Sequence, residues 1–113
     1  MAGPTPEAVL KAERSRTDRY RLGQFFTPEP VAKFMARAVL DTRPQTICDP
    51  GVGGGVLLRS IGAGPKLYGC DIDPRAVEVA SQALPEAEIV RGNFLARRAW
   101  PFSVDSFDAV ICN

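Results

Sequence analysis

Apolar residues recur along this chain first at a helical spacing and then in short runs. Between residues 28 and 40 they return every three or four positions, which predicts a helix with one apolar face. That face would consist of Val31, Phe34, Met35, Ala38 and Val39. Thr27 is the expected N-cap and Pro28 the first helical residue, because proline lacks the N–H that would stay unpaired there. Arg43-Pro44 ends the helix.

Short runs of β-forming residues follow, and helical patterns separate the first three of them. The runs cover residues 46–48, 67–70, 88–90 and 109–112. We expect helices over residues 55–61 and from Pro74 onward, the second of them capped by Asp73. The inward-facing residues of that second helix would be Val77, Ala80, Ala83 and Leu84. The alternation predicts βαβ units, and therefore an α/β fold with a parallel sheet.

Two segments show no such pattern. Residues 6–21 are polar with alternating charge, which favours a solvated helix or a frayed arm over a core element. Their arginines are suited to contact phosphate, although acidic neighbours in the same segment favour a solvated face. These arginines are Arg14, Arg16, Arg19 and Arg21. Residues 95–106 are expected to form a loop in which Trp100-Pro101-Phe102 covers the core.

Length, composition and charge limit the classes of protein to consider. A chain of 113 residues supports one domain, and its 45% apolar and 24% charged residues are typical of a globular protein. The net charge of +1 creates no general attraction for nucleic acid or a membrane surface, so any basic surface for DNA has to be local. No apolar stretch approaches the roughly 20 residues of a membrane span, and we expect no membrane partner.

The three cysteines are widely spaced, and each lies at the end of an apolar run. Cys48, Cys70 and Cys112 are therefore expected to be reduced core thiols in a cytoplasmic protein. A disulfide framework or a zinc site would need closer spacing and, usually, histidine, which the chain lacks. We expect no bound metal.

The segment between the first strand and the next helix is glycine-rich and reads DPGVGGG, residues 49–55. Glycines there permit positive φ angles and let a ligand approach the backbone, while the start of the helix supplies N–H donors. A purely structural turn would use the same residues. However, the second strand ends at Asp71, 20 residues after Gly51, where a carboxylate can accept hydrogen bonds from both hydroxyls of a ribose. The turn and the acid together predict a cofactor that contains a ribose.

Two residues favour S-adenosylmethionine over a dinucleotide such as NAD. A dinucleotide fingerprint would carry its third glycine, or an alanine, at the position occupied by Val56. Asp49 ends the first strand, and a carboxylate there suits a positively charged ligand better than a pyrophosphate. S-adenosylmethionine carries an ammonium and a sulfonium on one nucleoside.

Five motifs give the sequence a resemblance to a known family. In order and spacing they resemble the N-terminal part of adenine-N6 DNA methyltransferases of the restriction–modification type. The motifs are residues 23–28 (GQFFTP), 49–55 (DPGVGGG), 69–74 (GCDIDP), 92–95 (GNFL) and 107–113 (FDAVICN). The last resembles the start of the family's F-D-x-I-x-x-N-P-P-Y/F motif, so Pro-Pro-Tyr/Phe would follow Asn113. The resemblance covers residues 20–113 and leaves residues 1–19 as a polar arm or helix.

The resemblance implies a Rossmann-like class I S-adenosylmethionine-dependent methyltransferase fold, of which this chain holds the first four strands. The implied activity is methylation of adenine N6 in duplex DNA, with Asn113 as the catalytic residue that accepts a hydrogen bond from the adenine amine. The implied cofactor contacts are Phe26, Thr27, Asp49, Gly51, Gly53, Gly55, Asp71, Ile72, Asn93 and Phe94. The implied partners are duplex DNA, bound through the downstream region, and a restriction or specificity subunit.

Two alternatives stay open. The first is that the protein is a related enzyme with the same catalytic motif that acts on a protein glutamine or on RNA. The second is that the chain alone is a cofactor-binding remnant, or one piece of a split enzyme. The chain also departs from the family pattern at four positions. Asn93 and Asp71 replace the more common Asp and Glu, and Val52 and Gly54 replace the usual Cys and Ser of the glycine loop.

Overall fold

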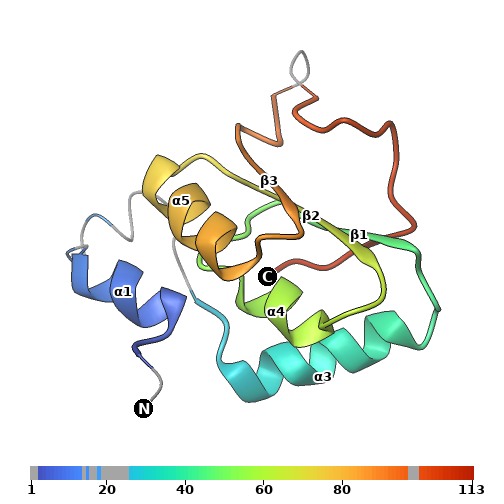
Figure 1. Ribbon diagram of the computed structural model, residues 1–113, viewed down its shortest axis with the longest axis horizontal. Coiled ribbons are helices and arrows are strands. Elements are labelled where there is room, and N and C mark those ends of the chain that lie inside the picture. The colour runs from blue at the N-terminus through green and yellow to red at the C-terminus, as the bar shows by residue number, and fades with distance from the viewer. Residues whose placement is uncertain (1–2, 14, 16–17, 19–25, 97–99) are drawn as a thin grey trace.

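The computed structural model describes residues 3–13, 15, 18, 26–96 and 100–113. Strands and helices alternate over most of this length (Figure 1). The helices are α1 (Pro6–Glu13), α3 (Glu29–Leu40), α4 (Val56–Ile61) and α5 (Pro74–Ala83). The strands are β1 (Thr46–Asp49), β2 (Lys66–Asp71), β3 (Glu88–Arg91) and β4 (Ala109–Val110). Each strand lies within two residues of the run that predicted it.

The four strands form one parallel sheet in the order β3-β2-β1-β4. In β1, Cys48 is paired with Tyr68 of β2 on one side and with Val110 of β4 on the other. The chain thus builds the sheet outward to β3 and then returns to the opposite side of β1. This is the order of the first four strands of a Rossmann fold, in which ligands bind beyond the carboxyl ends of the strands where the order reverses. The prediction of an α/β fold with a parallel sheet is confirmed.

Helices α3, α4 and α5 cover one face of the sheet (Figure 1). Ile47 of β1 is fully buried in a cluster that includes Ala36 of α3, Leu58 of α4 and Ala80 of α5. The glycine-rich turn contributes Val52 to the same cluster. The glycine-rich turn is therefore anchored in the core through Val52.

Aromatic side chains from the segment after β3 cover the opposite face. Phe102 is buried, and its ring packs edge-on against Tyr68 of β2 with the ring centroids 6.0 Å apart. Phe107 lies 5.1 Å from the same tyrosine ring. The prediction that the Trp100-Pro101-Phe102 segment covers the core is confirmed, with Trp100 half-exposed at its margin.

The N-terminal segment was expected to be a solvated helix or a frayed arm, and it forms a helix that is not fully solvated. Leu10 of α1 is fully buried against Ala76 and Val79 of α5, so α1 is part of the packed structure. Thr5 caps the helix by accepting a hydrogen bond from the Ala8 N–H. The polar composition concealed this arrangement because one leucine is enough to dock so short a helix. The four arginines of this segment, suited to phosphate but favoured to form a solvated face, are outside the described residues.

The buried face of α3 agrees with the prediction at Met35 and Val39, which pack against the core, but differs from it elsewhere. Ala32 and Ala36 are buried, whereas Phe34 is 74% exposed and Val31 is 47% exposed. Small residues face inward because α3 packs closely against α4. The helical spacing of apolar residues does not show whether alanines or larger side chains form the buried face. The helix begins at Glu29 after an N-cap at Pro28, and no side chain caps it. Thr27 has another role, described below.

Helix α5 follows the prediction more closely. Asp73 caps it by accepting a hydrogen bond from the Arg75 N–H at 3.0 Å, as expected. Of the predicted inward residues, Ala80 is buried and Leu84 packs against the core. Ala76 and Val79 are buried as well, because α1 covers a second side of this helix.

Two of the three cysteines agree with the prediction. Cys48 and Cys70 are buried free thiols, but Cys112 is exposed. It follows the edge strand β4, where Ile111 points into the core and its neighbour points outward. Burial raises the pKa of Cys48 to about 12 and also raises the pKa of Cys70.

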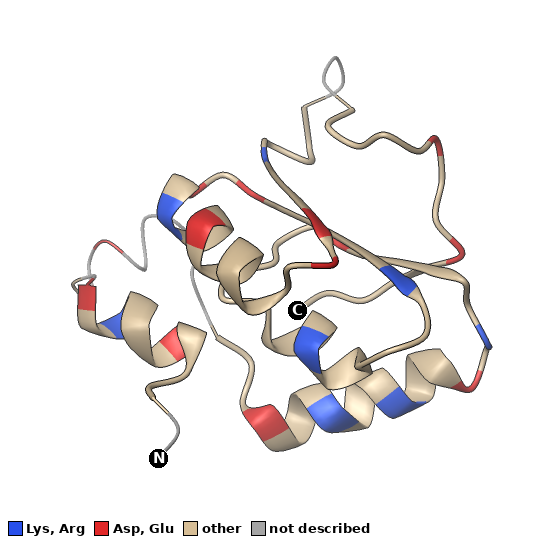
Figure 2. Ribbon diagram, in the orientation of Figure 1, with Lys and Arg blue, Asp and Glu red and all other residues tan. Residues whose placement is uncertain are grey.

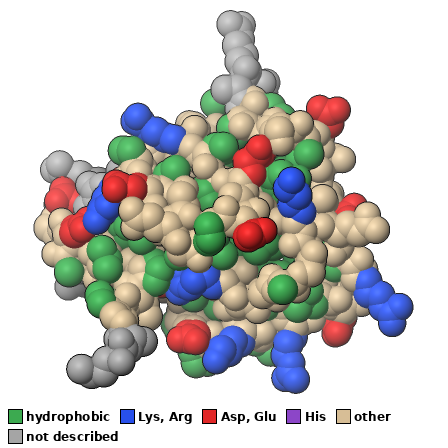
Figure 3. Space-filling model, in the orientation of Figure 1, with side chains coloured by type: hydrophobic (Ala, Val, Ile, Leu, Met, Phe, Trp, Pro, Cys, Tyr) green, Lys and Arg blue, Asp and Glu red, His purple; other side chains and the backbone are tan. Residues whose placement is uncertain are grey.

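Positive and negative side chains are intermixed over the helices (Figure 2). The space-filling view shows the same mixture, with lysine and arginine side chains along the edge formed by α3 (Figure 3). This distribution agrees with the net charge of +1. Within the described residues, no helix has the length and apolar character needed to cross a membrane.

Candidate functional site

A cavity of about 270 Å³ lies at the carboxyl ends of the parallel strands. Its lining comes from the segments that follow β1, β2 and β3, from the residues before α3, and from the end of the chain after β4. The predicted site residues that line it are Phe26, Thr27, Asp49, Gly51, Gly53, Asp71, Ile72, Asn93, Phe94 and Asn113. The sheet order therefore brings together residues that the sequence separates widely.

The glycine loop is held in a conformation that exposes its backbone to the cavity. Gly53 has a φ of 54°, in the left-handed region that favours glycine. Its N–H donates a hydrogen bond to Oδ2 of Asp71 at 2.9 Å. A side chain at Gly51 would meet no atom within 4 Å, so the loop is open to a ligand at this point.

Gly55 is the predicted site residue that does not line the cavity. It has a φ of 91° and is the N-cap of α4. A β-carbon at this position would lie 2.9 Å from Cδ1 of Leu84. In the structure, Gly55 turns the chain into α4 and allows α5 to pack closely.

Asp71 connects the glycine loop to the end of β2. Besides the Gly53 N–H, its carboxylate accepts the Asp73 N–H at 2.9 Å, through Oδ1. Each carboxylate oxygen has a second lone pair, so both can also accept hydroxyl hydrogens from a ligand. The two backbone bonds orient the carboxylate toward the cavity, which is the orientation that ribose binding requires.

Asp49 is a buried carboxylate in the floor of the cavity, with 1% of its surface exposed. Burial raises the pKa of Asp49 from 3.8 to about 7. The N–H of Gly51, which donates to Oδ1 at 3.1 Å, opposes this shift, and the nearby charge of Asp71 adds to it. A positively charged ligand in the cavity would stabilise the ionised form.

Another part of the cavity lining comes from the segments that follow β2 and β3. Ile72 and Phe94 present apolar surface, and Asn93 bonds the N–H of Leu95 through Oδ1 at 3.0 Å. Leu95 also lines the cavity although its side chain is 88% exposed. Leu95 belongs to the GNFL motif of residues 92–95 but was not among the predicted cofactor contacts. A flat heterocycle would fit between such apolar side chains.

Asn113 lines the cavity beside Thr27, just before the start of α3. Its Nδ2 donates a hydrogen bond to Oγ1 of Thr27 at 2.9 Å. Thr27 is itself buried, with 7% of its surface exposed. The residue expected to cap α3 therefore holds the predicted catalytic amide instead.

The chemistry of these groups fits S-adenosylmethionine. The open glycine loop offers backbone to a ligand, Asp71 suits a ribose, and the buried Asp49 suits a positive charge. The apolar wall at Ile72 and Phe94 suits an adenine ring. No pyrophosphate-binding feature is needed to account for the cavity.

Fold and site together define a cofactor-binding α/β domain of Rossmann type. A family model described as "Methyltransferase domain" matches residues 47–113, which is more than half of the chain. The protein therefore belongs to the methyltransferase domain family. This membership confirms S-adenosylmethionine as the predicted cofactor. None of the curated proteins matches the sequence significantly.

Solved structures of methyltransferases are similar to this chain. A TehB-like SAM-dependent methyltransferase from Corynebacterium glutamicum is 28% identical with a TM-score of 0.59, and the match covers 70% of this chain and 43% of that protein. An RNA methyltransferase from Salinibacter ruber in complex with S-adenosyl-L-homocysteine is 28% identical with a TM-score of 0.53, over 64% and 53% of the two chains.

An O-methyltransferase from Bacillus cereus in complex with SAH has a TM-score of 0.66 at 17% identity, over 100% of this chain and 55% of that one. This likeness concerns the fold alone. The chain spans about half the length of these three proteins.

Proposed function

We propose that this chain forms the cofactor-binding part of an enzyme that methylates the N6 amine of adenine in duplex DNA. The observation that carries the proposal is the hydrogen bond between Asn113 and Thr27 at the cavity. These two residues belong to the last and the first of the motifs that resemble the adenine-N6 family. Because 86 positions separate them, their contact supports treating both motifs as parts of one site.

The chemistry of an adenine amine explains what Asn113 would do. The amine is a weak nucleophile because its lone pair is delocalised into the ring, and an acceptor on one of its hydrogens draws the nitrogen toward a tetrahedral form. Since Nδ2 of Asn113 donates to Thr27, Oδ1 is the atom left to accept a hydrogen bond from the amine. In the family pattern, the backbone carbonyl of the proline after Asn113 supplies a second acceptor.

S-adenosylmethionine, when bound, would supply a methyl group on a sulfonium, and the sulfur would leave as a neutral thioether when the methyl group is transferred. The residues of this chain then have to hold the cofactor and the amine in line rather than provide an acid and a base. The cavity agrees with this requirement, since its polar groups are positioned by backbone hydrogen bonds. Asp71 accepts two such bonds and Asp49 one.

Methylation of RNA is a second candidate, favoured by one observation. The Salinibacter ruber protein, which is 28% identical over the matched region, is an RNA methyltransferase. An exocyclic amine of an RNA base would need the same acceptor at Asn113. The mixed charges in Figures 2 and 3 do not favour one nucleic acid over the other. Duplex DNA, a restriction or specificity subunit and a cytoplasmic location stay predictions.

Methyl transfer distinguishes these substrates. A polypeptide in which residues 1–113 continue into the Pro-Pro-aromatic sequence would be incubated with methyl-labelled cofactor and either duplex DNA or RNA of the same sequence. We expect label in N6-methyladenine of the duplex, and none when Asn113→Ala is introduced. Label in RNA or in a protein glutamine instead would contradict the proposal.

A further inference from the structure

Helix α1 packs beside α5 and is fixed at both ends by ion pairs, one of which reaches the glycine loop. At its C-terminal end, Glu13 pairs with Arg75 of α5, with Nε to Oε2 at 2.7 Å and Nη2 to Oε1 at 2.6 Å. Between the two ends, Leu10 is fully buried against α5. These contacts place a segment outside the motif resemblance against the methyltransferase fold (Figure 1).

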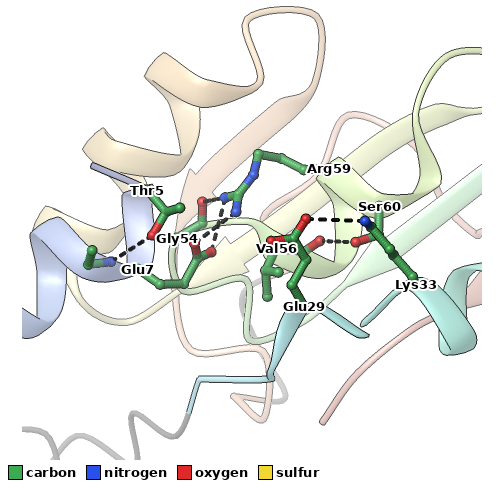
Figure 4. Close-up of polar contacts among 9 residues, drawn as sticks. Thr5, Glu7, Glu29, Lys33, Gly54, Val56, Arg59 and Ser60 are labelled. Atoms are coloured by element: carbon green, nitrogen blue, oxygen red, sulfur yellow. Dashed lines mark hydrogen bonds and ion pairs between the residues drawn. The ribbon is translucent and has the colours of Figure 1, made fainter. Parts of the chain in front are cut away.

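At its N-terminal end, α1 reaches the glycine loop through one guanidinium group. Arg59 of α4 binds the carboxylate of Glu7 with both terminal nitrogens, at 3.0 and 2.8 Å. Nη1 of the same arginine also donates to the carbonyl of Gly54 at 2.8 Å, as Figure 4 shows. Glu7 is 8% exposed, so this is a largely buried connection between α1 and the cavity lining.

The space around Gly54 shows that α1 and the loop are fitted to each other. A β-carbon at this position would lie 2.8 Å from Oε1 of Glu7 and 3.0 Å from its backbone nitrogen. Any larger residue would push against α1. Glycine therefore occupies the position at which the resembled motif carries serine, and Glu7 fills the space that a side chain would take.

Helix α1 also supports the other side of the cavity. Phe26, which lines the cavity, packs against the cluster formed by Leu10 and its neighbours, and Nζ of Lys11 lies 5.7 Å from the centre of its ring. The Phe26 ring approaches Gly53, where a β-carbon would lie 3.4 Å from its Cε1. Two consecutive residues of the glycine loop are thus supported by α1, one through Arg59 and one through Phe26.

We propose that Glu7 and Arg59 are positioning residues for the cofactor: they hold α1 and the carbonyl of Gly54 so that the glycine loop is ordered before the cofactor binds. The inference rests on the proposed role of this loop in binding S-adenosylmethionine. A loop of glycines loses much conformational freedom when it is fixed, and ordering it in advance lowers the free energy lost on binding. By linkage, a bound cofactor strengthens the docking of α1 to the same extent.

The test compares two glutamates on the same helix. Glu7→Gln weakens the pair that reaches the glycine loop, whereas Glu13→Gln weakens the pair with Arg75, and neither Glu13 nor Arg75 is among the described residues that line the cavity. Calorimetry with S-adenosylmethionine should show about tenfold weaker binding for Glu7→Gln and a change within about twofold for Glu13→Gln. Hydrogen exchange of residues 6–13, with and without cofactor, reports the docking of α1 independently.

Two further variants keep the inference testable if Glu7→Gln fails to fold. Arg59→Lys keeps the positive charge but loses the forked contact, and Gly54→Ala places a methyl group against Glu7. Both should weaken cofactor binding and reduce the protection of α1 from exchange. Equal binding by the wild type and Glu7→Gln, or equal losses for Glu7→Gln and Glu13→Gln, would overturn this inference alone. Absence of binding by the wild type would overturn the proposed function and this inference with it.

Discussion

Nδ2 of Asn113 lies 2.9 Å from Oγ1 of Thr27 and donates a hydrogen bond to it. A carboxamide is nearly symmetric in shape, so packing alone does not distinguish its nitrogen from its oxygen. The buried hydroxyl of Thr27 accepts from the nitrogen, and under the proposed function the oxygen would accept from the substrate amine. An orienting contact of this kind is what a transfer reaction without acid–base catalysis requires.

Replacement of Thr27 by valine should therefore slow methyl transfer. Valine has the same shape but no hydroxyl, which leaves Nδ2 of Asn113 without its partner and the amide free to rotate. In a polypeptide that is active in the assay described above, we expect kcat to fall about tenfold, with a smaller change in the KM for cofactor.

Thr27→Ser is the matched control, because it keeps the hydroxyl and loses one methyl group. It should retain most of the kcat. A Thr27→Val variant with wild-type kcat, or one affected only in the KM for cofactor, would show that Thr27 contacts the cofactor without orienting Asn113.

The raised pKa of Asp49 makes the free protein less stable as the pH rises. In the unfolded chain this carboxyl ionises near 3.8, whereas in the folded protein it stays protonated up to about pH 7. The unfolded state therefore loses its proton first, and the contribution of Asp49 to the free energy of unfolding decreases between about pH 4 and pH 7. Denaturant titrations at several pH values give the free energy of unfolding of the wild type and of Asp49→Asn. The decrease that Asp49 causes between pH 4 and pH 7 should be present in the wild type and absent from the variant.

Cofactor affinity should change with pH in the opposite direction. A positively charged ligand prefers ionised Asp49, so binding below pH 7 requires release of a proton. For a single group with a pKa of about 7, the affinity for S-adenosylmethionine should rise about tenfold between pH 6 and pH 8. Calorimetry across this pH range measures the affinity directly. If the affinity of the wild type changed as little with pH as that of Asp49→Asn, Asp49 would not be the group that binds the positive charge.

The cysteines should differ in reactivity by their burial. A thiol reagent at pH 8 should modify Cys112 rapidly, because it is exposed. Cys48 and Cys70 should react only when the protein unfolds, because burial raises the pKa of both thiols. Cys112→Ser should abolish the fast phase. Two or more rapidly reacting thiols in the folded wild type would be inconsistent with the packing of β1 and β2.

Many residues of the cavity lining could be predicted from the sequence, because parallel strands have their carboxyl ends at the same edge of the sheet. Asp49, Asp71 and Asn93 each end or follow a predicted strand, and the carboxyl ends of parallel strands meet at one edge. The positions of these residues therefore needed only the strand assignments and the strand order. Gly55 shows the limit of this reasoning, since a glycine in the same loop serves helix packing instead of the cavity.

The role of α1 was harder to predict, because it depends on contacts between distant residues. The alternating charge of residues 6–21 predicts a solvated helix or a frayed arm, and a helix is present over Pro6–Glu13. What the sequence does not reveal is that Glu7 meets Arg59, 52 positions away. Charged residues on a polar helix usually face solvent, and only the three-dimensional fold shows which of them are buried.

The central claim is that this cavity binds S-adenosylmethionine through Asp71. The control is Asp108, which also accepts two backbone N–H groups, from Gln45 and Thr46, but does so beside the start of β1 and outside the cavity lining. Loss of either carboxylate removes comparable structural hydrogen bonds, so a difference in affinity reports on the ligand.

Calorimetric titration of the wild type, Asp71→Ala and Asp108→Ala with S-adenosylmethionine tests this claim most directly. We expect saturable binding by the wild type and by Asp108→Ala. Binding by Asp71→Ala should be weaker by about 1.5–3 kcal/mol, or roughly 10–150-fold, through the loss of charge-assisted bonds to the ribose. Equal affinities for Asp71→Ala and the wild type, or no binding by the wild type, would contradict the account.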